Sequence, residues 1–443
     1  MKRVVNIILL PQRGNMSKKT KNIYLLILII ITLGFKYKIE NPMESIISPK
    51  NGDYISPIVY GLEKKDTLLS IIPSDLYYQI MATNFSYISD YKNSLKYWDI
   101  QSDTNEIILS DNEVKTIKNI KLVNASDYIK KRALNEKIIM FNEAHHNPIN
   151  RVFVSTILKD LRKNGYTYLA LETLNHYDVE DLNKRKYILQ KSGTYLADPV
   201  FSSMVNYALK LGYKLVAYEN QSNCKDNSLS CRQEREINQA NNLAQIFSKD
   251  KNAKVIVLAG YDHIIENNSF KMMAQYFKEQ TNINPLTVDQ VELCEKSKKE
   301  YEHPIFRSLS NENKIVNYSV ATLGGMPFVT KEKEKNIDIQ ILSPRISIIN
   351  SRPNYLINFV KKVKYSLYKN KLPNFDFTYI LIQAFNLSHE DSTYAIPSDQ
   401  FLLSKEELAK IKKMDLYLEK GEYLIKIKNN ENNLIYNEKT SIN

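Results

Sequence analysis

Between Lys137 and about residue 290, the sequence alternates short apolar runs with amphipathic stretches of helix length. The apolar runs are "KIIMFNEAH", "TYLALET", "KLVAYEN" and "AKVIVLAGYDH". Continuous apolar runs of this length are typical of strands that are buried on both faces, and the intervening helices make parallel connections possible. The sequence therefore predicts an α/β domain over residues 126–300, with a parallel sheet covered by helices on both faces and joined by right-handed crossovers.

The stretches between the apolar runs predict the connecting helices. Gly165 and Gly212 each follow such a stretch, at the position where a left-handed residue commonly ends a helix. The predicted helices cover residues 149–164, 199–211, 232–248 and 269–279.

The flanking parts of the chain have a different pattern. Residues 41–125 hold apolar and Tyr-rich runs at helical spacing, which predicts a helical N-terminal region. Residues 305–443 contain "NIDIQILSPRISII" and "GEYLIKIKNNENNLIYN", which alternate with period two, and the second has an Asn-rich turn. Hairpins are therefore expected in a strand-rich C-terminal domain.

The first 40 residues have the composition of an export signal. Lysines precede a 13-residue apolar run from Ile23 to Phe35, which is shorter than the roughly 20 residues that a membrane span needs. We expect an exported protein, in the periplasm or the cell envelope, with residues 1–40 as a signal peptide or an N-terminal anchor. No A-x-A cleavage site follows the apolar run, so cleavage and membrane anchoring both stay open.

The positive charge of the chain is concentrated in this leader. Of the formal net charge of +12, residues 1–40 supply +7 through eight Lys or Arg and one acid. The remainder shows no basic stripe interleaved with aromatic residues, which a nucleic-acid groove needs. We therefore expect no nucleic-acid partner.

Two of the three cysteines, Cys224 and Cys231, lie close together in the polar segment "NCKDNSLSC". In an oxidising compartment this spacing makes them a disulfide candidate. The same segment offers no further Cys or His for a metal site.

Each predicted strand of the α/β domain ends in an acid or an imidazole. In open α/β sheets, ligands bind outside the carboxyl ends of the strands, where the strand order switches. We therefore expect one crevice that collects these side chains, which are Glu143 and His145, then Glu172, then Glu219, then Asp262 and His263.

Local spacing refines this expectation. Glu143 and His145 are two residues apart and share one face of an extended chain, whereas His146 points the other way. His146 is then either a rim residue or a buried group that orients a neighbour. Arg235, near the start of a helix in "CRQERE", has the planar fork that holds a carboxylate bidentately.

Two chemistries are open for these residues. The imidazoles of His145 and His263, with Glu143, would form an open divalent-metal site that lowers the pKa of a bound water. Without a metal, a histidine oriented by a glutamate would itself be the general base for a water.

These stretches resemble the superfamily that joins erythromycin esterases, ChaN-type haem-binding lipoproteins, TraB and GumN proteins and Tiki proteases. The resemblance covers about residues 135–290 and is closest in character to the ChaN type. It implies an EreA/ChaN-like α/β core. Asn142 takes a position where the family has Gly, and Asn tolerates a left-handed backbone better than most residues. The matching segments are Asn142-Glu143-Ala144-His145, Glu172 in "ALET", Arg235 in "QEREINQ" and Gly260-Tyr261-Asp262-His263.

The resemblance implies two functions of different classes. The first is an exported hydrolase, of the esterase or peptidase class, that activates water for an unknown small-molecule or peptide substrate, with or without a divalent metal. Its catalytic residues would be Glu143, His145, Glu172, Arg235 and His263, and Asn142, His146, Glu219 and Asp262 would contact substrate or support them. The alternative is a haem- or iron-binding protein without catalytic activity, which uses Tyr or His as the ligand.

Overall fold

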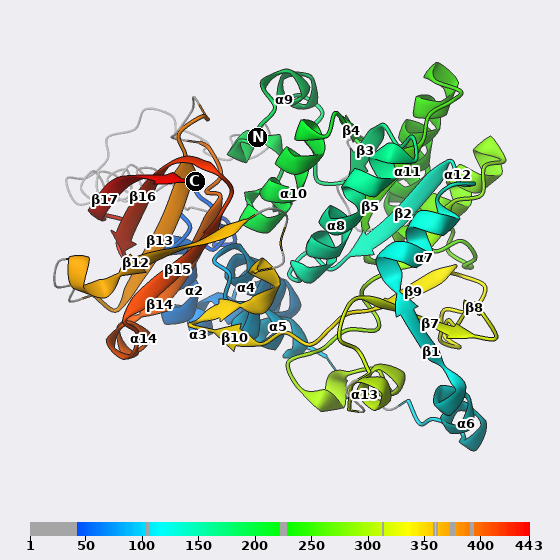
Figure 1. The fold of residues 1–443 in the computed structure, drawn as a ribbon, viewed down its shortest axis with the longest axis horizontal. Coiled ribbons are helices and arrows are strands. Elements are labelled where there is room, and N and C mark those ends of the chain that lie inside the picture. The colour runs from blue at the N-terminus through cyan, green and yellow to red at the C-terminus, as the bar shows by residue number, and fades with distance from the viewer. Residues whose placement is uncertain are drawn as a thin grey trace, which may run out of the picture. The chain divides into compact units, whose positions relative to one another are not determined.

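A computed structural model describes residues 42–443 apart from 103, 105–106, 222–227, 312–313, 358, 360–361, 373–376 and 390–393. The leader at residues 1–40 lies outside the described residues. The helices and strands from α2 to β17 all belong to the compact unit Ile46–Asn443 (Figure 1).

Within the described residues, a nine-stranded sheet has the order β1-β7-β9-β6-β2-β5-β3-β4, and β8 pairs with β7. Neighbouring strands from β9 to β4 pair in parallel, whereas β1, β7 and β8 add antiparallel pairs at one edge. The prediction of an α/β fold with a mostly parallel sheet is confirmed. The strands are β1 (Lys121–Asn124), β2 (Ile138–Glu143), β3 (Tyr168–Leu171), β4 (Lys214–Ala217), β5 (Val255–Gly260), β6 (Leu286–Asp289), β7 (Ser319–Leu323), β8 (Met326–Pro327) and β9 (Ile339–Leu342).

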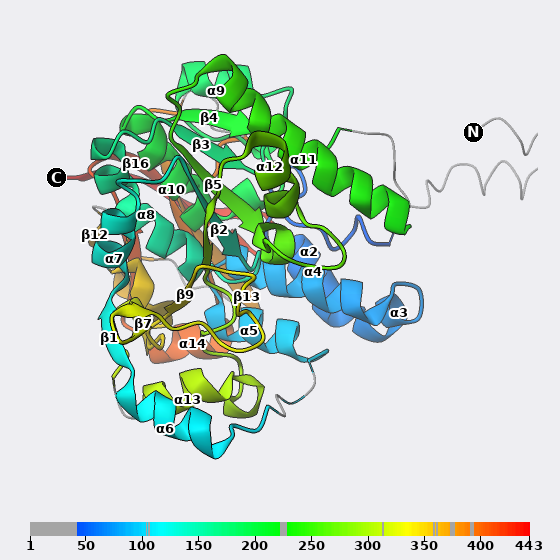
Figure 2. The same ribbon diagram turned by 90° about the vertical axis from the view of Figure 1, so that its right-hand side faces the viewer.

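Helices cover both faces of this sheet, as predicted. Ile139 and Phe141 of β2 pack into the same core as α8 and α10, while Ile138 and Met140 pack with α11 and α12 on the other face. Figure 2 shows these helices around the sheet. Side chains of successive strand residues point to opposite faces, so a strand buried on both sides must be apolar throughout. The helices are α7 (Ala125–Arg132), α8 (Ile149–Lys163), α9 (Val179–Arg185), α10 (Pro199–Lys210), α11 (Leu229–Lys249) and α12 (Met273–Thr281).

The ends of α8 and α10 follow from the sequence. Gly165 and Gly212 lie just beyond them with φ of +90° and +84°, a left-handed backbone that glycine adopts without a steric penalty. Pro199 starts α10 and the side chain of Asp198 accepts a hydrogen bond from Val200 N, which caps the helix.

The strand order changes direction between β2 and β5, which are neighbours in the sheet. The chain leaves β2 through α8 to β3, on the far side of β5, and leaves β5 through α12 to β6, on the far side of β2. The two crossovers run in opposite directions and on opposite faces. This opens a crevice beyond the carboxyl ends of β2 and β5.

The segment before the sheet is helical. Its helices are α2 (Ser56–Glu63), α3 (Lys65–Leu69), α4 (Ser74–Tyr87), α5 (Tyr91–Asp99) and α6 (Asp111–Asn119). The predicted helical region, 41–125, also includes β1, which joins the edge of the central sheet.

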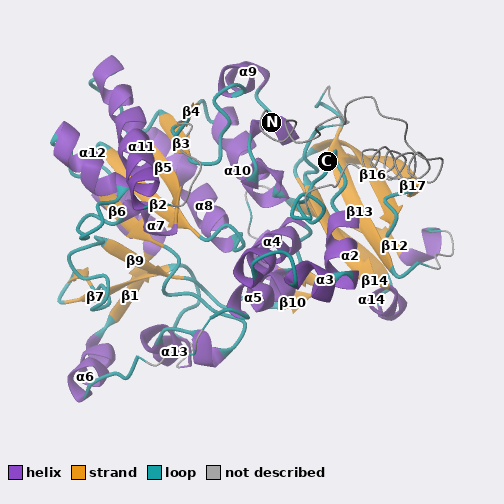
Figure 3. Cartoon of the chain, turned by 180° about the vertical axis from the view of Figure 1, so that it is seen from behind, coloured by secondary structure: helices purple, strands orange, loops and turns teal. Residues whose placement is uncertain are grey.

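The C-terminal region is rich in strands, as predicted (Figure 3). A four-stranded antiparallel sheet in the order β14-β13-β16-β17 shares a hydrophobic core with the pair β12-β15. The predicted hairpin at "GEYLIKIKNNENNLIYN" is confirmed by the antiparallel pairing of β16 with β17. The elements are β12 (Val363–Tyr368), β13 (Tyr379–Asn386), β14 (Asp399–Ser404), α14 (Lys405–Lys410), β15 (Lys413–Leu418), β16 (Gly421–Asn429) and β17 (Leu434–Ile442).

The other expected hairpin, at "NIDIQILSPRISII", is wrong. Its first half is β9, which pairs with β6 and β7 in the central sheet, and its second half, β10 (Ile348–Ile349), pairs with β11 (Arg352–Pro353). Ile339 and Ile341 are fully buried in the core of the α/β region, and the larger sheet therefore outcompetes a local hairpin. The sheet continues past residue 300, where the α/β domain was expected to end. The connection from β6 to β7 contains α13 (Pro304–Asn311).

Two further expectations, the N-terminal signal or anchor and the disulfide of Cys224 with Cys231, involve residues that the structure does not describe. Among the described residues, none of the helices combines the length and the apolar character needed to cross a membrane. Cys231 is disulfide-bonded, while Cys224 lies outside the described residues. Cys294 is a buried free thiol.

Candidate functional site

The side chains expected at the strand ends meet beside Gly260, the last residue of β5. A Cβ atom placed on Gly260 would lie 3.2 Å from both Glu172 Oε2 and His145 Nε2. Gly260 N also donates a 2.5 Å hydrogen bond to Glu172 Oε2. Because any larger residue would intrude on these atoms, the close approach requires glycine here. The carboxyl ends of β2, β3 and β5 thus share one site.

His145 is held by a fixed carboxylate. Its Nδ1 lies 3.0 Å from Glu143 Oε1, and Glu143 accepts hydrogen bonds from Arg151 Nε at 2.6 Å and Nη2 at 3.1 Å. Arg151 Nη2 also donates to the backbone carbonyl of His145 at 3.0 Å. The local spacing expected for Glu143 and His145 therefore brings the two side chains into contact.

Arg151 on α8 connects this pair to a second acid. Its Nη1 donates a 2.6 Å hydrogen bond to Asp198, the residue that caps α10, and the Arg151 side chain is fully buried. Burial by itself would raise the pKa of Glu143, but the Arg151 guanidinium and the hydrogen bonds from His145 and Arg151 lower this pKa to about 2. Glu143 therefore carries a negative charge at every physiological pH.

Glu172 and Glu219 share the guanidinium of Arg235. Arg235 Nη2 lies 2.6 Å from Glu172 Oε1 and also pairs with Glu219, to which Arg235 Nε donates at 3.0 Å. Burial raises the pKa of Glu172, but His263, His145 and Arg235 outweigh this effect and lower it. Arg235 does hold carboxylates, as expected, but they belong to the protein. Its fork is therefore not open to a bidentate substrate carboxylate.

His263 is held in the same way as His145, by an acid that the sequence did not single out. His263 Nδ1 lies 2.8 Å from Glu236 Oε1, and Glu236 Oε2 accepts a hydrogen bond from Met273 N at 2.8 Å. His263 Nε2 lies 3.7 Å from Glu172 Oε1. Burial lowers the pKa of His263, but Glu172 and Glu236 more than offset this and leave it raised.

Both histidines thus use Nδ1 for a carboxylate, while His263 Nε2 lies near Glu172 and His145 Nε2 lies beside Gly260. A carboxylate at Nδ1 places the proton on that nitrogen of a neutral imidazole, so Nε2 keeps a lone pair. An imidazolium carries a proton at Nε2 as well. The site therefore holds two oriented groups that accept or donate a proton at Nε2.

Aromatic rings form two walls of the site. The ring of Tyr195 stacks on His145 with centroids 3.8 Å apart, and Trp98 from α5 stacks on His146 at 4.1 Å. His146 is buried and directed away from His145, as expected, and its Nδ1 lies 3.5 Å from Tyr261 Oη. Burial lowers the pKa of His146 well below its ordinary value, so this ring stays neutral and supports the wall.

Asn142 and Asp262, which were expected to contact substrate or support the catalytic residues, do not line the cleft described below. Asn142 lies within β2 and has no left-handed backbone; its amide bonds Tyr261 O, Asp289 Oδ1 and Gln290 N, which fastens β2 to the segments after β5 and β6. The side chain of Asp262 is 60% exposed and faces Lys333 at 3.6 Å. Residues in the tight turn after β5 point in different directions, so His263 enters the site while Asp262 faces solvent.

The donors present do not fit the divalent metal considered from the sequence. Both oxygens of Glu143 are bound by Arg151 and His145, and both oxygens of Glu172 are bound by Arg235 and Gly260 N. In the part of the chain that the structure describes, no group of three or more His, Cys, Asp or Glu side chains is arranged to hold an ion. The guanidinium groups of Arg151 and Arg235 already occupy the carboxylate oxygens that a cation would need.

A cleft of about 530 Å³ opens beside the site, with Glu172, Tyr195, Glu219 and Arg235 in its wall. This volume suits a small molecule or a short segment of a larger one. The cleft is continuous with the solvent-accessible side of Arg235, whose side chain is 39% exposed.

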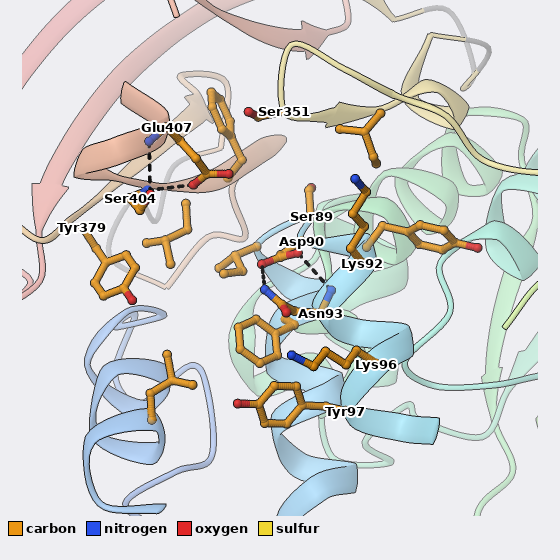
Figure 4. A pocket seen from close by; sticks show the side chains of 17 residues that line it. Ser89, Asp90, Lys92, Asn93, Lys96, Tyr97, Ser351, Tyr379, Ser404 and Glu407 are labelled. Carbon is orange, nitrogen blue, oxygen red and sulfur yellow. Dashed lines mark hydrogen bonds between the residues drawn. The ribbon is translucent and has the colours of Figure 1, made fainter. Parts of the chain in front are cut away.

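Another pocket, of about 620 Å³, lies between α5 and the strand-rich region (Figure 4). Its acids are used within the fold: Asp90 accepts a hydrogen bond from Asn93 N and caps α5, and Glu407 pairs with Ser404 in the cap of α14. It contains none of the residues that the sequence singled out.

Sequence reasoning missed four residues that complete the site: Arg151, Asp198, Glu236 and Tyr195. Two of them carried a weak local signal, since Asp198 precedes a proline at a helix start and Glu236 follows Arg235 in "QERE". Arg151 and Tyr195 carried none, because their roles depend on which distant strand or helix they pack against.

Comparisons with known proteins identify no family. No family model matches the chain, and no curated protein matches it. Among solved structures, it is similar to the type III effector HopBA1 at 13% identity and a TM-score of 0.33, over 52% of this chain and 98% of that one. It is also similar to RRSP, a MARTX toxin effector domain from Vibrio vulnificus CMCP6, at 15% identity and a TM-score of 0.29, over 56% of this chain and 55% of that one. A structure described as bacterial protein toxins matches at 16% identity and a TM-score of 0.30, over 50% of this chain and 47% of that one.

Proposed function

We propose that this protein is a hydrolase of esters or amides that activates water with its two carboxylate-held histidines and needs no metal. The observation that carries the proposal is the matched pair of histidines, His145 with Glu143 and His263 with Glu236. His263 Nε2 lies 3.7 Å from Glu172 Oε1, and His145 Nε2 lies beside Gly260 at the same site. Paired acid and base groups of this kind are what acyl transfer to water requires.

His145 is the proposed general base. Its Nε2 takes a proton from water, and the oxygen of that water attacks the substrate carbonyl carbon. Glu143 stabilises the imidazolium that forms, because it stays ionised. Arg151 keeps the Glu143 carboxylate in place and so fixes the orientation of the ring.

His263 is the proposed general acid. Glu172 and Glu236 raise the pKa of His263, so its protonated form persists to higher pH than that of an ordinary histidine, and its Nε2 proton is then available for the leaving oxygen or nitrogen. When the C–O or C–N bond breaks, the leaving group takes this proton. Proton exchange with solvent returns both histidines to their starting states, so one water is consumed per bond cleaved.

Arg235 and Glu172 form the proposed charge centre between the histidines. Arg235 Nε and Nη2 are used by Glu219 and Glu172, while Nη1 makes no hydrogen bond with any described residue. Nη1 is therefore free to bind the oxygen on which negative charge develops in the transition state.

We also propose that residues 135–290 belong to the superfamily of erythromycin esterases, ChaN-type, TraB and GumN and Tiki proteins. The support is the convergence of Glu143, His145, Glu172, Arg235 and His263, the residues that carried the resemblance. Export through residues 1–40, to the periplasm or the cell envelope, remains part of this proposal.

The test is turnover of model esters and peptides by the purified protein, with His145→Asn and His263→Asn compared with the parent. Each variant is expected to lose about 10²–10⁴-fold in kcat while its unfolding temperature changes little. Glu180→Gln, on the surface of α9, is the control for Glu172→Gln, and only Glu172→Gln should lose activity. Full turnover by both histidine variants would remove the proposal.

Metal dependence is checked in the same assay. Because the carboxylates of the site are bound by Arg151 and Arg235, dialysis against EDTA is expected to leave the rate unchanged. A rate that vanishes with EDTA and returns with a divalent ion would contradict the metal-free mechanism.

The haem alternative stays a prediction and has its own readout. Burial, together with Glu172 and Glu143, raises the pKa of Tyr195 to about 12, so this phenol keeps the proton that an iron ligand would lose. A Soret band that saturates at one haem per chain would favour the alternative, and hydrolysis without haem uptake would favour the enzyme.

A further inference from the structure

A small cavity of about 40 Å³ lies between α10 and the strand-rich C-terminal region, away from the proposed catalytic groups. Ser202, Ser203 and Asn206 of α10 form one side. Lys362 and His389 form much of the other. The proposed hydrolase does not use this cavity.

Lys362 brings a buried charge to the cavity without a matching acid. Lys362 is only 8% exposed, and its Nζ donates a 2.7 Å hydrogen bond to Ser398 O. Among the described residues it forms no ion pair within 4 Å. A buried ammonium is costly unless a negative charge compensates it.

Among the described residues, the two acids that act most on Lys362 are already used by other cations. Asp399 is bound by Arg352 and accepts a hydrogen bond from Tyr417 N, while Glu419 pairs with Lys210. Burial lowers the pKa of Lys362, and Asp399 and Glu419 act in the opposite direction without reversing it. Among the described residues of the wall, Lys186, Lys210 and Lys362 outnumber one acid, Glu419.

Further polar side chains line the rest of the cavity. His389 Nδ1 has no hydrogen-bond partner among the described residues, although the ring is fixed by stacking on Tyr187 at 4.5 Å. Asn206 uses its Oδ1 to accept from Ile188 N, which leaves its NH₂ group for the cavity. The hydroxyls of Ser202 and Ser203 complete this lining.

We propose that this cavity binds a small monovalent anion of the size of chloride, held by Lys362 Nζ, His389 and the α10 serines. Its volume corresponds to about three water molecules, at roughly 10–15 Å³ for each, which suits a monatomic anion with a water and leaves little room for a larger one. The bound anion would neutralise Lys362 and join α10 to the strand-rich region.

The test is thermal unfolding of the full chain in sodium chloride and in sodium gluconate at equal ionic strength. Since an anion that binds only the folded state stabilises it by mass action, the unfolding temperature should rise with chloride to a higher value than with gluconate. Lys362→Met should abolish this difference. Lys249→Met, at the end of α11, removes one charge elsewhere and should keep it.

Equal unfolding temperatures in the two salts, or a chloride effect that survives in Lys362→Met, would overturn the proposal. If Lys362→Met does not fold, His389→Phe keeps the ring stack on Tyr187 and removes the donor, so a weaker chloride effect is expected. Bromide offers a direct check by anomalous scattering: a peak beside Lys362 Nζ supports the site, and water alone at that position rejects it.

Discussion

At the scale of single residues, the site depends on neutralised charge in a buried place. Glu143, Arg151 and Asp198 are almost completely buried, and each carboxylate is bound to the guanidinium between them. An unpaired buried charge would destabilise the fold by several kcal/mol, so these residues act as one unit. His145 is oriented by that unit, but its side chain remains 19% exposed and is therefore accessible to water.

Gly260→Ala tests how closely the site is packed. The backbone at Gly260 has φ −71° and ψ 147°, which alanine adopts without strain, so the added methyl acts only on its neighbours. It would lie 3.2 Å from His145 and Glu172 and push both aside. We expect a fall of roughly 10²-fold in kcat/KM with a small change in unfolding temperature. Unchanged kinetics would show that His145 and Glu172 need no fixed placement.

The raised pKa of His263 predicts a pH dependence. Protonated His263 is the proposed acid, so kcat should decline as the pH rises through this raised pKa, above about 6.5. The folded protein also binds this proton more tightly than the unfolded chain. Its contribution to stability is therefore complete below about pH 6.5 and is lost as the pH rises through the folded pKa.

Glu236→Gln supplies the control for this profile. Without the Glu236 charge, one cause of the raised pKa disappears, and the alkaline limb of the kcat profile should move to lower pH. A profile that does not move would assign the limb to another group.

At the scale of elements, Asp198 at the start of α10 connects this helix to Arg151 on α8. Asp198 both caps the first turn of α10 and binds Arg151, so one side chain fixes the helix start and the histidine support. Helix caps are typically worth about 1 kcal/mol, and removal of one partner from a buried ion pair costs about 3–5 kcal/mol.

Two substitutions separate these contributions. Asp198→Asn keeps a capping oxygen but removes the charge, whereas Asp198→Ala removes both, so urea denaturation should rank the stabilities as parent, then Asn, then Ala. Activity should fall in both variants, since Arg151 would no longer be held from two sides. Equal stabilities for Asn and Ala would mean that the cap contributes nothing.

At the scale of the whole molecule, three parts of the sequence meet around one crevice. Helix α5 of the N-terminal segment brings Trp98 onto His146, the α/β core supplies the reacting groups, and β7 and β9 from beyond residue 300 widen the sheet. Because Trp98 is the single tryptophan of the chain, its fluorescence reports the packing of α5 against the core.

This arrangement predicts cooperative unfolding of residues 46–443. In a urea titration, the fluorescence of Trp98 and the far-ultraviolet circular dichroism should change with the same midpoint, since α5 and the core belong to one compact unit. A fluorescence transition at lower urea would show that the N-terminal helices separate before the sheet unfolds.

The sequence by itself determined the order of the α/β elements, the ends of α8 and α10, and the positions of Glu143, His145, Glu172 and His263 at strand ends. These features follow from hydrophobic period, proline and glycine, which act over a few residues. Only the tertiary structure decided that β9 joins the central sheet instead of its expected hairpin. It also decided that Arg151 binds Glu143 and Glu236 binds His263, and that Asn142 connects β2 to the segment after β5. Those outcomes depend on which distant segments compete for the same sheet edge or carboxylate, and no local pattern records that competition.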